Sequence, residues 1–130
     1  MTDPVQAAVE LWRQPPTIDG SAVDRFRRAY ADPVLINGVP TTCAELVERA
    51  RATHEALDDL AMEIVDRFDV GDRCAVVFRQ SGTHVGRFPG ATVEPTGDTV
   101  SGIGIDVFTF VEGKIAKIWV VSELSARLSG

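Results

Sequence analysis

The stretch from Ile103 to Ser122 constrains the fold of this chain more than any other part of its sequence. It reads as two strands joined by a turn at Glu112-Gly113, and successive side chains of a strand point to opposite faces of a sheet. One face then carries Asp106 among glycines and phenylalanines, while the other face is aliphatic. Because both faces are largely apolar, we expect helices to wrap the sheet. A carboxylate in that setting must be paired, hydrogen-bonded or open to a cavity.

The composition describes an ordinary globular protein, and we expect residues 1–130 to form a single domain. The 130 residues carry a formal net charge of -6 without a cluster of Lys and Arg. Nucleic acids and anionic membrane surfaces both attract basic patches, so neither is an expected partner. A small hydrophobic molecule fits this composition better.

The two cysteines, Cys43 and Cys74, form no CxxC motif and have no histidine cluster beside them, so we expect reduced cysteines and no metal site. The N-terminal residues include Asp3 and Pro4 in place of a basic segment before an apolar run. We therefore expect a cytoplasmic protein without a membrane span.

Three helices are expected in the first half of the chain. Asp3 and Pro4 begin the first, and Pro15-Pro16 ends it. The second carries Val23, Phe26 and Tyr30 along one face and stops at Asp32-Pro33. The third opens with a capping box formed by Thr42 and Glu45.

Strands are expected in the second half. A period of two begins near Leu60, and a long strand runs from Cys74 to Phe88, in which Gly82 and Gly86 mark bulges or bends. Pro89 to Asp98 reads as a loop. The hairpin at Ile103 follows, and Glu123 to Gly130 reads as a polar tail. Helices followed by a meander of strands indicate an α+β fold.

Six short motifs occur in a fixed order along almost the whole chain. They are YADP from Tyr30, DVGDRCAVVF from Asp69, GTHVGRFPG from Gly82, PTG from Pro95, GIDVFTF from Gly104 and EGKIAKIW from Glu112. Together they resemble the SnoaL-like polyketide cyclases, which belong to the nuclear transport factor 2-like superfamily with ketosteroid isomerase and limonene epoxide hydrolase.

The resemblance implies a cone-shaped α+β barrel, in which three N-terminal helices wrap a strongly curved antiparallel sheet around a deep apolar pocket. It also implies a homodimer through the sheet face, a hydrophobic small-molecule substrate and no cofactor. On the face opposite Val120, Trp119 is then a candidate for sheet packing or for the dimer interface, and Lys117 for a charge at the rim.

The resemblance places the general acid/base of the cyclases at the position of Val120, which cannot carry a proton. Glu123 lies three residues further on, at the expected strand end. GIDVFTF is similar to the ketosteroid isomerase segment in which a neutral Asp donates a hydrogen bond to the substrate oxyanion. Of that enzyme's other groups, the general base would fall near Asn37 and a tyrosine near Trp12.

Asp106 is the expected proton donor or oxyanion stabiliser, and the alternative is a structural carboxylate bonded to backbone or to an Arg such as Arg79. His84 could orient a substrate or act as a base, although a lone histidine beside glycine at a strand end is more often a surface or hydrogen-bonding residue. Gly102 and Gly104 either leave room for a cavity or bend the strand.

The expected substrate-binding residues are aromatic and aliphatic side chains with one amide, and periodicity alone cannot separate pocket wall from core. They are Trp12, Phe26, Tyr30, Phe78, Gln80, Phe108, Ile118 and Val120. Asp32, before Pro33, reads as part of a turn or as a catalytic acid, and His54 as an exposed or helix-capping residue.

These features predict an enzyme that cyclises or isomerises a hydrophobic carbonyl compound of polyketide type, with Asp106 as its main polar group. A binding module that holds a hydrophobic metabolite without reaction is the alternative. Epoxide opening is a weaker alternative, because the resemblance would then require an Arg at Gly104 and an acid at Val120.

Overall fold

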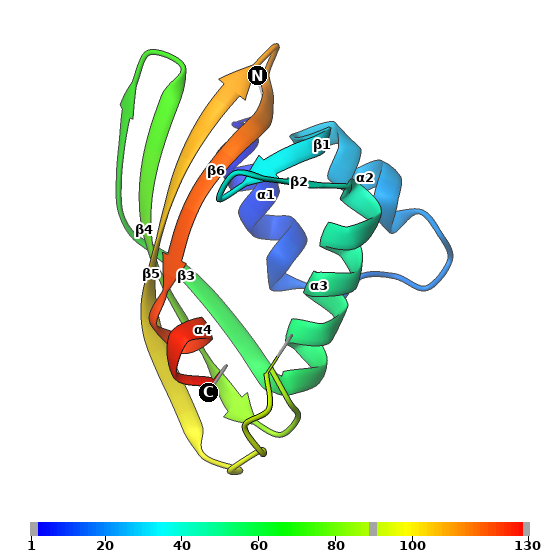
Figure 1. The fold of residues 1–130 in the computed structure, drawn as a ribbon, viewed down its shortest axis with the longest axis vertical. Coiled ribbons are helices and arrows are strands. Elements are labelled where there is room, and N and C mark those ends of the chain that lie inside the picture. Colours follow the sequence, from blue (N-terminus) through cyan, green and yellow to red (C-terminus); the bar gives the residue numbers. More distant parts are fainter. Residues whose placement is uncertain (1–2, 89–90, 129–130) are drawn as a thin grey trace.

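One curved, six-stranded sheet organises the chain, with the strand order β2-β1-β6-β5-β4-β3. The computed structural model describes residues 3–88 and 91–128. The strands are β1 (Tyr30–Ile36), β2 (Val39–Thr41), β3 (Leu57–Val70), β4 (Arg73–His84), β5 (Thr99–Val111) and β6 (Lys114–Ser122). The sheet does not close on itself (Figure 1), and its one parallel pairing among the described residues joins β1 to β6, where the sequence predicted antiparallel strands throughout.

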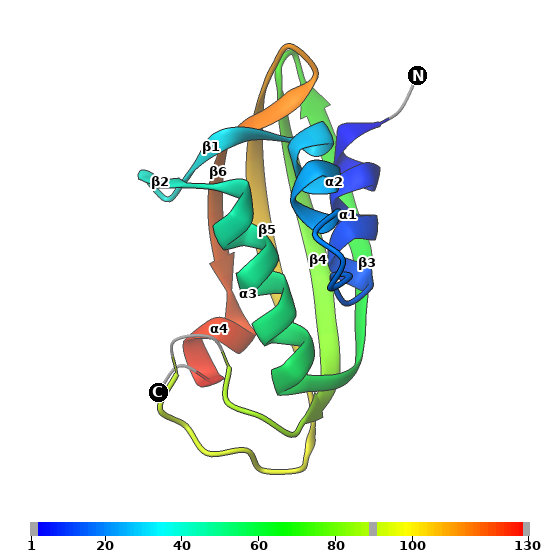
Figure 2. The ribbon, with the colours of Figure 1, turned by 90° about the vertical axis from the view of Figure 1, so that its right-hand side faces the viewer.

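Helices cover the concave side of this sheet (Figures 1 and 2). They are α1 (Pro4–Arg13), α2 (Ala22–Ala29), α3 (Cys43–Ala56) and α4 (Glu123–Leu128). The predicted starts of α1 and α3 are confirmed: the Asp3 side chain accepts from Val5 N, and Thr42 and Glu45 form a capping box. These caps satisfy backbone N–H groups that a helix cannot pair internally.

Several boundaries differ from the prediction. The long strand expected to reach Phe88 ends at His84, and two further differences have physical reasons. The second helix ends at Ala29, and Tyr30 is extended (φ -117°, ψ 146°) and begins β1, because it pairs with Ile115 of β6. The predicted polar tail forms α4, because Leu124 and Leu128, four residues apart, bury one face against the sheet. The chain thus has a fourth helix among its described residues.

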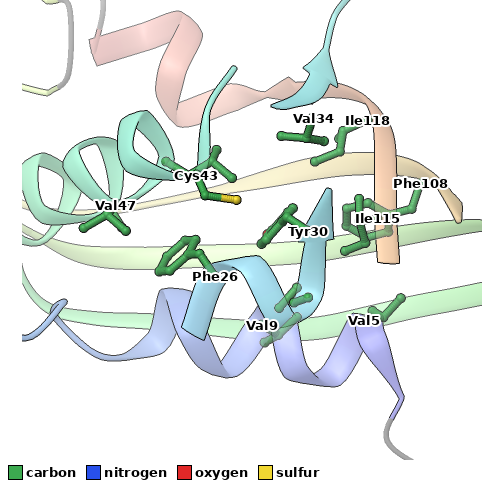
Figure 3. Packing of buried hydrophobic residues seen from close by; sticks show 14 of the residues in the cluster. Val5, Val9, Phe26, Tyr30, Val34, Cys43, Val47, Phe108, Ile115 and Ile118 are labelled. Atoms are coloured by element: carbon green, nitrogen blue, oxygen red, sulfur yellow. The ribbon is translucent and has the colours of Figure 1, made fainter. Parts of the chain in front are cut away.

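The main core lies between α1, α2, α3 and the sheet, where the labelled side chains of Figure 3 meet. They are Val5, Val9, Phe26, Tyr30, Val34, Cys43, Val47, Phe108, Ile115 and Ile118. A smaller cluster of Ala56, Leu57, Phe88, Leu124 and Leu128 fixes α4. Fully burying one large apolar side chain contributes about 1.5–3 kcal/mol, so these clusters hold the concave face in place.

Candidate functional site

Asp106 lies on the concave face in the middle of β5, paired in register with Val76 of β4 and Val120 of β6. Its side chain is partly buried, and no described residue forms a hydrogen bond with its carboxylate. Burial raises its pKa to about 7, because the apolar surroundings disfavour the charged form. Near neutral pH this carboxyl group therefore exists in both protonation states, as a proton donor or acceptor requires.

The second polar group of the concave face is the hydroxyl of Tyr30. Trp12 Nε1 donates a hydrogen bond of 2.8 Å to Tyr30 Oη, and the two side chains come from α1 and from the start of β1. Burial raises the pKa of Tyr30, and the charge of Asp106 raises it further, so the two groups interact electrostatically. Since Trp12 is the donor, the hydroxyl hydrogen of Tyr30 remains available for a different acceptor.

The aromatic side chains beside Tyr30 fix its position. Phe26 stacks on its ring at a centroid distance of 5.9 Å and an interplanar angle of 15°. The Trp12 ring packs edge-on against Phe26, at a centroid distance of 5.9 Å and an interplanar angle of 72°. Sequence reasoning named all three residues, but not the hydrogen bond between Trp12 and Tyr30. No local pattern indicates it, because the residues lie eighteen positions apart on different elements.

The space above the two glycines of β5 is filled, which contradicts the expectation that they leave a cavity. A Cβ on Gly104 would lie 2.1 Å from Cζ of Phe78, so the phenyl ring lies directly over this glycine. A Cβ on Gly102 would approach Glu123 Cβ and Leu124 Cγ of α4 at 3.1 Å. Both glycines permit close packing, and the ring of Phe78 becomes part of the concave surface.

His84 lies far from Asp106, near the end of β4. Val76 is the register partner of Asp106, and eight residues further along the strand correspond to about 26 Å. The imidazole is 0% exposed, and neither ring nitrogen has a partner among the described residues. His84 is therefore not a surface residue, and it does not converge with Asp106 on one point.

The remaining predicted binding residues divide between core and concave surface. Phe26, Phe108 and Ile118 are buried in the main cluster, while Trp12 and Val120 are only partly buried against it. Phe78 and Gln80 are nearly buried and share the inward face of β4. Val120 is the register neighbour of Asp106, so the position that the resemblance gives to the family's acid is next to this carboxylate.

Four other polar residues have structural partners. Asp32 accepts from Cys43 N and from Arg27, which hold the pKa of its carboxyl below the usual value. Glu123 Oε1 accepts from Ile103 N at 2.7 Å. The Asn37 amide pairs with the backbone of Val120, and His54 Nε2 lies 2.9 Å from Trp12 O at the end of α1. These contacts explain the residues without catalysis.

The structure contradicts the alternative in which Arg79 binds the Asp106 carboxylate. Arg79 Nη1 pairs with Glu63 at 2.9 Å. Because β4 alternates, Arg79 lies on the face opposite Phe78 and Gln80, which is the convex face. Arg79 therefore does not pair with Asp106, and burial is the one cause of the raised pKa of this carboxyl among the described residues.

Two open hollows lie elsewhere on the molecule. One, of about 350 Å³, is lined by Ile103, Ile105, Val121, Ser122 and Glu123. The other, of about 420 Å³, lies between the α1–α2 loop and the end of α3. Neither contains Asp106, so a deep apolar pocket around that residue stays a prediction.

Two further findings concern residues 3–88 and 91–128. No group of three or more His, Cys, Asp or Glu side chains there could hold a metal ion. No helix in those ranges is long and apolar enough to cross a membrane.

Comparison with known proteins agrees with the fold and the motif order. The model of the SnoaL-like polyketide cyclase family matches residues 3–129. The chain belongs to the SnoaL-like polyketide cyclase family. No curated protein matches it.

Solved structures share the same architecture. TsrD from Streptomyces laurentii is 18% identical, with a TM-score of 0.78 over 98% of this chain and 92% of that one. AclR from Streptomyces galilaeus, described as a candidate hydroxylase, is 25% identical, with a TM-score of 0.67 over 96% and 83%. A protein of ketosteroid isomerase-like fold from Catenulispora acidiphila is 13% identical, with a TM-score of 0.69 over 100% and 94%. These likenesses establish the fold, and the chemistry has to come from the residues of this chain.

Proposed function

We propose that this chain is a cofactor-independent enzyme that cyclises or isomerises a hydrophobic carbonyl substrate of polyketide type. One observation carries the proposal: the Asp106 carboxyl has no hydrogen-bond partner among the described residues, and burial raises its pKa to about 7. A buried carboxyl group poised near neutrality is typical of a catalytic acid. Membership of the family supports the polyketide class of substrate. Action in the cytoplasm is part of the same proposal.

The first step common to both reactions is enolisation. Neutral Asp106 gives its proton to the substrate carbonyl oxygen, while water takes a proton from the adjacent carbon. The electron pair of the broken C–H bond forms the C=C bond of the enol. Tyr30 donates a hydrogen bond to the same oxygen, which stabilises the charge that develops there. In isomerisation, the enol carbon then binds the proton that water holds, and the Asp106 carboxylate takes back the enol proton. In cyclisation, the enol carbon attacks a second carbonyl carbon instead, the oxygen of that carbonyl takes the proton from water, and Asp106 again recovers the enol proton.

Exchange of hydrogen for deuterium beside a ketone tests this step without knowledge of the natural substrate. We expect the protein to accelerate exchange at the α carbons of 2-tetralone in D₂O, measured by proton NMR. Asp106→Asn should slow exchange at least tenfold, because an amide cannot transfer the proton. Asp32→Asn is the matched control and should leave the rate unchanged. Exchange no faster than in buffer, or equal in wild type and Asp106→Asn, would refute the reaction.

A binding module is the second candidate, favoured by the distance between His84 and Asp106. Because His84 is far away, it cannot serve as a second acid or base beside Asp106. Val120, the register neighbour of Asp106, cannot carry a proton either. In this case 2-tetralone should bind, as measured by equilibrium dialysis, while its α hydrogens exchange at the buffer rate.

We further propose a homodimer through the convex face of the sheet. Exposed apolar side chains extend over it from β3 to β6, including Phe68 (61% exposed), Ile105 (41%), Trp119 (45%) and Val121 (69%). A contiguous apolar face of this kind favours association over exposure to water. Lys117 Nζ lies 5.2 Å from the Trp119 ring centroid, at the edge of this surface.

A further inference from the structure

A third polar group of the concave face is the side-chain amide of Gln80. Its side chain points inward from β4, is 9% exposed, and forms no hydrogen bond with any described residue. An amide carries two N–H donors and an acceptor, and the Gln80 amide is not among the fully buried side-chain atoms that lack a partner, so it is open to solvent or a ligand. Such a group is typical of a binding site that is completed by a ligand.

The position of Gln80 relative to Asp106 follows from the sheet register. Asp106 pairs with Val76, and Gln80 lies four residues further along β4, opposite Gly102. At 3.3 Å per residue, the two polar side chains are about 13 Å apart along the strand direction. Both residues belong to the set of alternate positions whose side chains face the helices, so they lie on the same face of the sheet.

The side chains between these two groups are apolar. The ring of Phe78 lies across Gly104, midway between the register pairs of Asp106 and of Gln80. Ile64 and Met62 are the neighbours on β3 and are partly accessible. At the far end α4 packs over Gly102, beside Gln80. A flat apolar body resting on Phe78 would thus have a polar group at either end.

We infer that Gln80 binds a second oxygen of the substrate, at the end opposite the carbonyl that Asp106 activates. This inference rests on the proposed function and narrows its substrate class. Two hydrogen bonds of about 2.8 Å each leave about 7 Å between the two substrate oxygens. The inferred substrate therefore carries a second oxygen about 7 Å from the carbonyl oxygen that Asp106 activates.

Two ketones that differ by one oxygen test this inference. 2-Tetralone has a single oxygen, and 6-hydroxy-2-tetralone adds a hydroxyl at the far end of the two-ring skeleton. We expect the wild-type protein to bind the hydroxylated ketone roughly three- to tenfold more tightly in equilibrium dialysis, as one neutral hydrogen bond would provide. Gln80→Leu, which keeps the approximate size, should remove this preference and bring the ratio of the two affinities to about one. Gln6→Leu, at an exposed position of α1, should preserve the preference.

Each outcome decides the role of Gln80 separately from that of Asp106. Equal affinities of the wild-type protein for the two ketones, a preference that survives in Gln80→Leu, or no binding of either ketone would overturn the inference. A preference that depends on Gln80 would support it even if neither ketone exchanges its α hydrogens. In that last case the proposed reaction fails, while the second oxygen site remains.

Discussion

Replacing Asp106 by asparagine should stabilise the protein at alkaline pH, because the ionised carboxylate is poorly solvated in the folded chain. Burial raises its pKa from 3.8 to about 7. Between these values the folded chain keeps a proton that the unfolded chain has lost. The stability that Asp106 contributes is thus complete below pH 3.8 and is lost as the pH rises through 7.

The size of the effect follows from the shift. One pKa unit corresponds to 1.36 kcal/mol, so the full loss is about 4 kcal/mol, of which about 3 kcal/mol falls between pH 5 and pH 8. This is an upper limit, since the carboxylate keeps some access to water. An asparagine resembles the neutral acid at every pH, so Asp106→Asn should lose much less stability over the same range.

Urea unfolding at pH 5, 6, 7 and 8 measures this difference directly through the free energy of unfolding. Asp32→Asn is the control: Arg27 and Cys43 N lower the pKa of Asp32, so its contribution is lost only as the pH falls through that lowered value. Its effect should therefore be the same at all four pH values. Parallel loss of stability in wild type and Asp106→Asn from pH 5 to pH 8 would refute the burial of an uncompensated carboxyl group.

Three further predictions concern the concave and convex faces. Gly104→Ala should destabilise the protein by about 1–3 kcal/mol in urea unfolding, because the added methyl overlaps the ring of Phe78. Phe78→Leu in the same chain should recover part of this loss, whereas an unchanged unfolding midpoint of Gly104→Ala would mean that the ring lies elsewhere. Combining Asp106→Asn with Val120→Asp moves the carboxylate to the register partner on β6. The double variant should recover part of the α-hydrogen exchange of 2-tetralone that Asp106→Asn loses, as measured by NMR. No recovery at all would show that the site requires the acid on β5. Trp119→Glu should convert a dimer into a monomer in sedimentation equilibrium, since it places a charge in the apolar convex face; a wild-type monomer, or a dimer that survives the change, would exclude this interface.

The fold could be predicted well because its evidence is local. The capping box at Thr42 and the alternation in β5 each depend on residues close together in the chain, and each of the six motifs is itself a short segment. The prediction failed at Tyr30, where periodicity extended a helix that the pairing of β1 with β6 replaces. It failed again at Leu124 and Leu128, whose two apolar positions are too few to indicate a helix before their packing partners are known.

For the candidate site, the sequence alone singled out Asp106. A carboxylate in an apolar strand is costly to bury unless it is paired, hydrogen-bonded or open to a cavity, whatever the position of that strand in the fold. Only the tertiary structure decided what surrounds it. Register brings Val120 beside Asp106, and packing seats Phe78 over Gly104. The contact between Trp12 and Tyr30 joins separate elements, and strand length separates His84 from the carboxylate. The physical reason is that a side chain's type is written in the sequence, whereas its desolvation and its partners depend on which distant segments the fold brings against it.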